Sequence, residues 1–148
     1  MQLVIRQASR KDIPYVLDLY NELETDKSAV LKEAQANEIF DKMSSYPNYK
    51  LYVAEMDNEI VGSFSLAVMD NLAHMGMPSG LIEDVVVKHH WQNKGIGRQM
   101  MHFAIERCRE SGCYKAALSS NKKRLIAHRF YESLGFKKHG YSFSVDLL

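Results

Sequence analysis

The sequence predicts an α/β fold (α+β by some schemes) with a mixed sheet and helices on both faces. Apolar residues alternate with period 2 in some segments and recur at helical spacing in others, and the two patterns follow one another along the chain. The run at 81–87 is β-branched and fits a central, buried strand. Gly95 and Gly97 then introduce a helical pattern, so the predicted order is β-α-α-β-β-β-α-β-α-β.

The N-terminal half is expected to hold one strand, two helices and a hairpin. Residues 3–8 alternate as the first strand, and Ser9 with Asp12 resembles a capping box that begins a helix over 10–24. The pattern then predicts a loop at 25–30 and a second helix that stops before 44. We expect these to be followed by strands over 49–55 and 60–69, with a bulge at Gly62, and by a long loop at 70–80.

The C-terminal half alternates again between helix and strand after the central strand. The helix that begins near Gly95 has apolar residues on one face and ends at Gly112. The pattern then predicts a strand over 114–119, a helix over 123–134 that Gly135 stops, and one or two closing strands over 136–148.

Length and composition exclude several classes of protein. The chain has 148 residues, which fits a single domain over 1–148 with its own core. Its formal net charge of +1 lacks the basic excess of a nucleic-acid-binding protein, so we expect no nucleic-acid partner. No apolar run approaches the ~20 residues that span a bilayer, and the N-terminus alternates like a strand, so neither a membrane segment nor a signal peptide is expected.

The cysteines and histidines do not form a metal motif. Cys108 and Cys113 have neither zinc-pair nor CxxC spacing, which favours two reduced thiols in a cytoplasmic protein. The six histidines are scattered without an HxH or HxxxH pair, so no metal site is expected.

The segment from 85 to 98 combines a buried strand, a short glycine-containing loop and the start of a helix. Glycines let the backbone approach an anion closely, and the first helical turn offers unpaired amides at the positive end of the helix dipole. Lys94 and Arg98 add positive charge. This arrangement suits a phosphate or pyrophosphate, although a glycine pair that only helps a helix to pack is the alternative.

Three phosphate-loop patterns compete for this segment. A Walker A loop requires GxxxxGK[ST], whereas Lys94 precedes the glycine. A dinucleotide fingerprint requires a third glycine where Met100 stands. The pattern [Gln/Arg]-x-x-Gly-x-[Gly/Ala] is satisfied by Gln92, Gly95 and Gly97, and it resembles the acetyl-coenzyme A pyrophosphate loop of the GNAT superfamily of N-acetyltransferases.

Two further segments resemble the same family. Residues 127–136 are similar to its A-x-x-F-Y-x-x-x-G-F signature, and 82–87 to its fourth strand. The C-terminal half looks like that of bacterial small-amine acetyltransferases such as aminoalkylphosphonate N-acetyltransferase, while Glu83-Asp84 is similar to glucosamine-6-phosphate N-acetyltransferases. The resemblance implies the GNAT fold, a mostly antiparallel sheet of six to seven strands with a V-shaped splay after the fourth strand and about four helices.

The resemblance also implies which residues bind acetyl-CoA, the co-substrate. The pantetheine arm would pair with main-chain groups at the end of the fourth strand, and loop amides would hold the pyrophosphate. Asn121 would contact the arm or merely form a turn, and Arg124 with its basic neighbours would meet the 3′-phosphate or stay solvated. The implied cofactor-binding residues are Val85, Val86, Val87, Gln92, Asn93, Lys94, Gly95, Ile96, Gly97, Arg98, Asn121, Arg124 and Tyr131.

Two residues are candidates for the catalytic groups. Tyr131 matches the family's tyrosine near the thioester sulfur and would reprotonate the leaving thiolate, or would only pack against its helix. Glu83 lies two residues before Val85 on the predicted strand, so both should point to the same face. The Glu83 carboxylate would accept the ammonium proton or bind the ammonium, or would pair with an arginine.

The predicted function is transfer of an acetyl group from acetyl-CoA to the primary amine of a small polar acceptor, such as a phosphorylated or phosphonate amine. Neither cysteine is placed as a nucleophile, which favours direct attack in a ternary complex. Acetylation of a protein N-terminus or lysine, and a non-catalytic acetyl-CoA-binding module, are the alternatives. A homodimer is an expectation from the resemblance alone.

Overall fold

The computed structural model describes residues 2–23 and 29–148. The chain divides into two compact units, Met1–Ala117 and Leu118–Leu148, which are described separately below. Residue 24 of the predicted first helix and residues 25–28 of the predicted loop lie outside the described residues.

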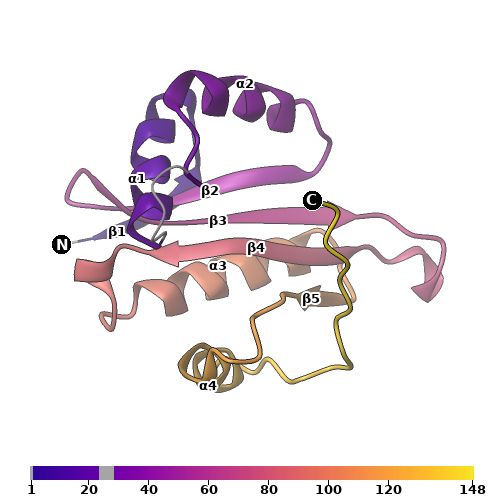
Figure 1. Ribbon diagram of the computed structural model, residues 1–148. Coiled ribbons are helices and arrows are strands. Elements are labelled where there is room, and N and C mark those ends of the chain that lie inside the picture. The colour runs from indigo at the N-terminus through magenta and orange to yellow at the C-terminus, as the bar shows by residue number, and fades with distance from the viewer. Residues whose placement is uncertain (1, 24–28) are drawn as a thin grey trace. The chain divides into compact units, whose positions relative to one another are not determined.

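The first unit is built on a mixed five-stranded sheet (Figure 1). Neighbouring strands are antiparallel except the last pair, which is parallel. In sheet order the strands are β1 (Leu3–Gln7), β2 (Tyr49–Met56), β3 (Glu59–Met69), β4 (Ser79–Val87) and β5 (Lys115–Ala117).

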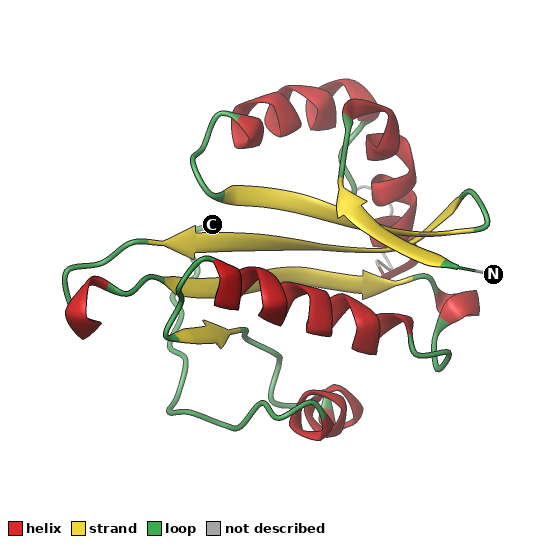
Figure 2. Ribbon diagram, turned by 180° about the vertical axis from the view of Figure 1, so that it is seen from behind, coloured by secondary structure: helices red, strands yellow, loops and turns green. Residues whose placement is uncertain are grey.

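Helices cover both faces of this sheet (Figure 2). A short 3-10 helix, η1 (Arg10–Asp12), leads into α1 (Ile13–Leu23), and α1 and α2 (Glu33–Ser44) lie on one face, whereas α3 (Ile96–Glu110) lies on the other. Two further 3-10 turns, η3 (His74–Gly76) and η4 (His89–Trp91), stand before and after β4.

Each face of the sheet has its own apolar core. Under α1 and α2 the buried residues are Ala8, Ile13, Val16, Leu19, Ala36, Leu51, Val53, Ile60 and Val86. On the α3 face, Phe103 packs edge-on against Phe64 and Tyr52, with centroids 6.4 and 5.2 Å away. The approach of β4 to α3 is close, because a Cβ at Gly80 would overlap the Cys108 sulfur.

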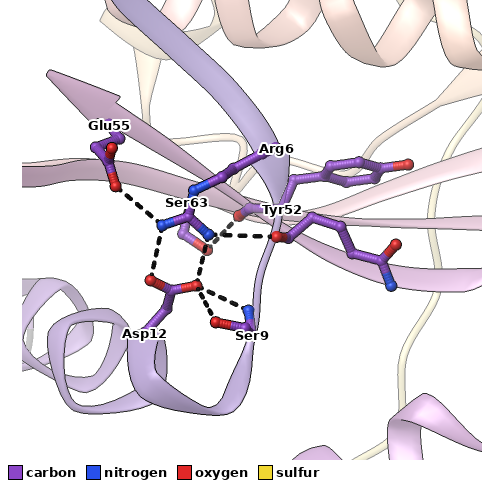
Figure 3. Close-up of polar contacts among 7 residues, drawn as sticks. Arg6, Ser9, Asp12, Tyr52, Glu55 and Ser63 are labelled. Atoms are coloured by element: carbon purple, nitrogen blue, oxygen red, sulfur yellow. Dashed lines mark hydrogen bonds and ion pairs between the residues drawn. The ribbon is translucent and has the colours of Figure 1, made fainter.

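An ion-pair network joins β1 to the start of α1 (Figure 3). Arg6 donates to Asp12 at 2.7 Å and to Glu55 at 2.9 Å. Asp12 also accepts from the Ser9 amide at 2.7 Å, as the predicted capping box requires. The hydrogen bond from Arg6 is the main reason why the pKa of Asp12 falls from 3.8 to about 2.

The second unit contains one helix, α4 (Leu125–Ser133). The Tyr131 ring lies edge-on to Phe130 and Phe136, with centroids 5.2 and 5.8 Å away. The closing strands predicted over 136–148 are wrong, because this segment forms no strand. Period-2 alternation describes side chains only, whereas a strand also requires a backbone partner.

The predicted α/β class, its mixed sheet and its helices are confirmed, but the sheet has five strands rather than six to seven among the described residues. The predicted bulge at Gly62 is also confirmed, because the β2–β3 register shifts where Ala54 faces Gly62 and Glu55 faces Ile60. No described helix is long and apolar enough to span a membrane.

Candidate active site

A β-bulge interrupts β4 next to the predicted catalytic carboxylate. Glu83 pairs with Ser65 and Val86 pairs with Ser63, so two β4 residues, Asp84 and Val85, stand against a single residue of β3. Asp84 has a φ of +53°, in the left-handed region that few residues other than glycine adopt. The bulge therefore shifts the alternation of side chains in the middle of β4.

This shift corrects the expectation that Glu83 and Val85 share a face. Directly paired residues of neighbouring strands have side chains on the same side of the sheet, so Glu83 and Val86 share the face of Ser63 and Ser65. Val86 belongs to the core under α1, which identifies that face. Glu83 is thus on the α1 side, and its carboxylate is exposed.

Two serines lie on this same face of β3, where a central strand would ordinarily bury apolar side chains. Ser63 and Ser65 are 0% and 2% exposed. The Ser63 hydroxyl donates to the Tyr52 carbonyl at 2.9 Å (Figure 3), and the Ser65 hydroxyl donates to the Glu83 carbonyl at 3.3 Å. The serines therefore replace apolar packing by bonds to β2 and to the residue just before the bulge.

A phenol of α1 lies against this polar strip. Burial raises the pKa of Tyr20 to about 12, and the negative charge of Asp84 adds to the rise. Tyr49 acts in the same direction, while a hydrogen bond with Ser63 opposes it. Tyr20 therefore stays protonated at neutral pH and lies within hydrogen-bonding reach of Ser63.

Sequence reasoning missed Tyr20 and the serines. The helical spacing of Tyr20 is the same as that of a core residue, so nothing separates it from its apolar neighbours. Ser63 and Ser65 did leave a signal, because both alternate with apolar residues in a β3 segment that is buried on both faces. Small hydroxyls at alternate positions of such a strand point to a polar strip under the covering helix.

The predicted pyrophosphate loop follows β4 directly. Its main chain takes left-handed conformations at Asn93, with φ +61°, and at Gly95, with φ +83°. Gly95 is the residue just before α3, and the first turn of that helix contains no acidic residue. The first amides of a helix lack intrahelical partners and carry the positive end of its dipole. This loop therefore has the donor chemistry that an anion requires.

Side chains of the loop hold it against the sheet. The Gln92 amide donates to the Val87 carbonyl at 3.1 Å. Lys88 pairs with Glu59 at 2.8 Å, and the Trp91 indole donates to the same carboxylate at 3.3 Å. The hydrogen bond from Lys88 holds the pKa of Glu59 below its usual value. These bonds anchor both ends of η4.

Cationic side chains remain on the solvent side of the loop. Lys94 is exposed, with its Nζ 5.1 Å from the centre of the Trp91 ring, and Arg98 on the first turn of α3 is exposed too. They add positive charge where the helix dipole is also positive.

The open edge of β4 begins well before the loop. β5 pairs with β4 only from Ser79 to Leu81. From Ile82 to Val87, β4 pairs with β3 alone among the strands of the described first unit. The predicted splay after the fourth strand is thus confirmed within this unit, and Val85 and Val87 lie along it.

The remaining predicted residues lie in the second unit. Asn121 accepts from the Lys123 amide at 2.9 Å, and its carbonyl bonds His128 Nε2 at 2.8 Å, so its side chain closes the turn before α4. Burial raises the pKa of Tyr131, while the charge of Arg124 opposes the rise. The structure thus groups Glu83, Val85–Val87 and Gln92–Arg98 in one unit, and Asn121, Arg124 and Tyr131 in the other.

Within residues 2–23 and 29–148, no three His, Cys, Asp or Glu side chains gather to hold a metal ion.

Comparison with known proteins identifies the family. Residues 16–136 match the model of the acetyltransferase (GNAT) family. The chain belongs to this family and is an acyltransferase of the N-acetyltransferase class. Members of the family use acetyl-CoA as co-substrate.

Several relatives are similar over much of the chain. An aminoalkylphosphonate N-acetyltransferase of Salmonella typhimurium is 32% identical over 97% of this chain and 90% of its own. A glucosamine 6-phosphate N-acetyltransferase of Trypanosoma brucei brucei is 37% identical over 66% of this chain, and the match covers 65% of that enzyme, just under two thirds of its length. The solved structure of a putative acetyltransferase from Agrobacterium tumefaciens superposes with a TM-score of 0.90 at 30% identity, covering 97% of this chain and 99% of that one.

Proposed function

We propose that this protein transfers the acetyl group of acetyl-CoA to the primary amine of a small polar acceptor. The observation that carries the proposal is the bulged, open-edged strand β4 leading through Gly95 into the N-terminus of α3. One end of this arrangement offers amides to an anion, and the other presents carboxylates beside a polar strip. These are the two chemistries that a diphosphate-bearing acyl donor and a cationic amine require.

Acetyl-CoA supplies the activated thioester when it is bound. In this proposal the amides of residues 92–98 hold the pyrophosphate, and Lys94 and Arg98 neutralise its charge. Main-chain groups of Val85, Val86 and Val87 on the open edge of β4 pair with the pantetheine arm as an added strand would. In the second unit, Asn121 would contact the arm and Arg124 the 3′-phosphate.

The acceptor amine must lose a proton before it attacks. A primary alkylamine has a pKa near ~10.4, so deprotonation at pH 7 costs about 4–5 kcal/mol. We assign acceptance of this proton to the exposed carboxylate of Glu83, directly or through a water molecule. Tyr131, whose pKa is raised by burial, stays protonated and would return a proton to the leaving thiolate.

Direct attack by the amine agrees with the raised pKa of the buried Cys108 thiol. Burial raises the pKa of Cys108 to about 11, so this thiol is almost entirely protonated and a poor nucleophile at neutral pH. An acetylated Cys108 intermediate is therefore not part of the proposal. The transfer would take place in a ternary complex of protein, acetyl-CoA and amine.

The names of the relatives support a small polar amine as acceptor. Two of them act on amines that also carry phosphorus, an aminoalkylphosphonate and glucosamine 6-phosphate. We therefore propose an acceptor that combines a primary amine with a phosphate or phosphonate group.

Release of coenzyme A from acetyl-CoA, measured against a panel of amines, tests the proposal. The panel contains aminoalkylphosphonates, amino sugar phosphates, polyamines and peptides. We expect one phosphorus-bearing amine to exceed the others, and Tyr131→Phe to lower kcat roughly 100-fold while the Kd of acetyl-CoA stays within twofold. Binding of acetyl-CoA without turnover of any amine would count against catalysis, and highest turnover with a peptide would replace the acceptor class.

A further inference from the structure

We propose that the carboxylates of Glu59 and Glu22 are positioning residues for acetyl-CoA, because they hold η4 and, through it, the loop that follows. This inference rests on the proposed function and adds two residues outside the loop that determine how well the loop binds a diphosphate. Both belong to the first unit, Glu59 at the start of β3 and Glu22 in the last turn of α1.

Glu59 is held on a rigid element. The two residues before it, Asp57 and Asn58, have φ of +51° and +63°, as the tight two-residue turn of a hairpin requires. Glu59 pairs with Met56 across this β2–β3 hairpin. The Glu59 side chain therefore starts from a fixed backbone position.

The Glu59 carboxylate bonds to both ends of η4. One oxygen pairs with Lys88 Nζ at 2.8 Å, just before η4, and the other accepts from the Trp91 indole N–H at 3.3 Å, at the last residue of η4. The Lys94 ammonium group lies 5.1 Å from the centre of the same Trp91 ring. Glu59 thus determines where the indole lies, and the indole determines where one cation of the loop lies.

Glu22 holds the same turn from α1. Its carboxylate accepts from the His89 main-chain amide at 2.9 Å. A hydrogen bond from an amide to a carboxylate is charge-assisted and stronger than a neutral one. Two elements that are far apart in the sequence, the β2–β3 hairpin and α1, therefore fix η4 through side chains of the same charge.

The negative charge of these residues is the reason to assign them a positioning role. A carboxylate near a loop that binds a diphosphate repels that ligand, so electrostatics alone would favour neutral side chains. The loop also contains Gly95 and Gly97, which make an unrestrained backbone flexible. Fixing the loop before the ligand arrives lowers the entropy cost of binding, and this gain offsets the repulsion.

The sign of a substitution's effect separates the two roles. If charge alone decides the affinity, removing either carboxylate strengthens acetyl-CoA binding. If position decides it, the same substitution weakens binding, because the loop must then be ordered by the ligand itself.

Charge-removing and charge-keeping substitutions test the proposal on the full chain. Glu59→Gln and Glu22→Gln remove the charge with little change of shape, whereas Glu59→Asp keeps the charge and shortens the side chain by one methylene. The matched control is Glu110→Gln, because Glu110 forms an ion pair with Arg107 at 2.7 Å in the last turn of α3, at the other end of that helix from the loop. Circular dichroism melting curves verify that each variant is folded.

Calorimetry gives the Kd of acetyl-CoA for each variant. We expect Glu59→Gln and Glu59→Asp each to raise this Kd roughly tenfold and Glu22→Gln to raise it roughly three- to tenfold, with the control within about twofold of the wild type. Trp91 is the only tryptophan of the chain, so its fluorescence reports on the loop directly. Iodide should quench this fluorescence more in Glu59→Gln than in the wild type.

A donor without the diphosphate provides the readout that a merely structural role would not separate. S-acetylpantetheine carries the thioester and the pantetheine arm but offers nothing for the loop amides to hold. Its kcat/KM with 2-aminoethylphosphonate should therefore stay within about twofold of the wild type in every variant, because the lost positioning acts only on the diphosphate.

The outcomes distinguish this inference from the proposed function. Turnover by the wild type with unchanged or tighter acetyl-CoA binding in Glu59→Gln overturns the positioning role and leaves the acetyltransferase function standing. An equal loss with S-acetylpantetheine also overturns the positioning role, because a general loss of structure affects both donors. Weaker acetyl-CoA binding in Glu59→Gln, without turnover of any amine by the wild type, supports the positioning role and counts against the proposed chemistry. Failure of the wild type to bind acetyl-CoA overturns both.

Discussion

Single residues determine which groups face the α1 side of the sheet, and Asp84 has the largest effect. With regular alternation, Glu83 and Val85 would share one face and Asp84 would point the other way. The left-handed Asp84 instead turns the chain so that Val86, rather than Val85, shares the face of Glu83. Aspartate tolerates this conformation better than most residues do, and local strain of this kind is typical of functional sites.

At the same scale, the Asp12 carboxylate predicts how stability depends on pH. Its pKa is about 2 in the folded chain against 3.8 ordinarily, because Arg6 donates to it. The Asp12 carboxylate is thus protonated more readily in the unfolded chain than in the folded one. The stabilisation is complete above pH ~4 and is lost as the pH falls from about 4 to 2, and it amounts to about 2 kcal/mol.

We therefore expect Asp12→Asn to lower the free energy of unfolding by about 2–4 kcal/mol at pH 7, measured by urea denaturation. The difference from the wild type should shrink markedly at pH 2.5. Asp41→Asn is the control, because Asp41 pairs with Arg10 in an exposed ion pair at 3.3 Å, and such pairs contribute little. An equal loss at both pH values would contradict this account of the ion pair.

At the scale of elements, the turn into α3 requires a left-handed residue at Gly95 and belongs to the proposed pyrophosphate loop. Gly95 and Gly112 stand at opposite ends of α3, with φ of +83° and +77°, and a Cβ at either would meet nothing within 4 Å. Alanine at either position therefore costs about 1 kcal/mol of conformational strain without a steric clash. Only Gly95 lies where the loop amides are proposed to hold the pyrophosphate.

We expect Gly95→Ala and Gly112→Ala to lower stability by similar amounts, while only Gly95→Ala weakens acetyl-CoA binding, by about tenfold or more in calorimetry. Equal affinities for acetyl-CoA in the two variants would show that this turn does not shape the anion site.

The sequence predicted elements well where local patterns determine them. The capping box at Ser9, the hairpin with its bulge near Gly62 and the glycine turn before α3 each rest on residues close together in the chain. The bulge at Asp84 escaped prediction because the run at 81–87 is rich in β-branched residues, which is typical of an uninterrupted strand. The prediction of closing strands over 136–148 failed because strand pairing depends on a partner that is distant in the sequence.

The candidate site, like the elements, was predicted only where a local pattern defines it. The loop from Gln92 to Arg98 could be found because the glycine spacing itself permits the backbone turn that leads into α3. Tyr20 could not, because its contact with the buried serine of β3 arises only when α1 covers that strand. Contacts between elements that are far apart in the sequence leave no periodic signal.

At the scale of the whole molecule, the proposed machinery is divided between two compact units. Glu83 and the pyrophosphate loop belong to the first, whereas Asn121, Arg124 and Tyr131 belong to the second. The family match over 16–136 spans the division at Ala117. If both units contribute to one acetyl-CoA site, binding of this ligand must stabilise both.

Acetyl-CoA at about 100 times its Kd should stabilise the folded chain by about 2.7 kcal/mol, which raises Tm by roughly 5–10 °C. Hydrogen exchange measured with and without the ligand locates this effect. We expect slower exchange of amides in 85–98 of the first unit and in 121–131 of the second. Slower exchange in the first segment alone would remove Asn121, Arg124 and Tyr131 from the acetyl-CoA site, because a ligand held by both units suppresses local opening in each.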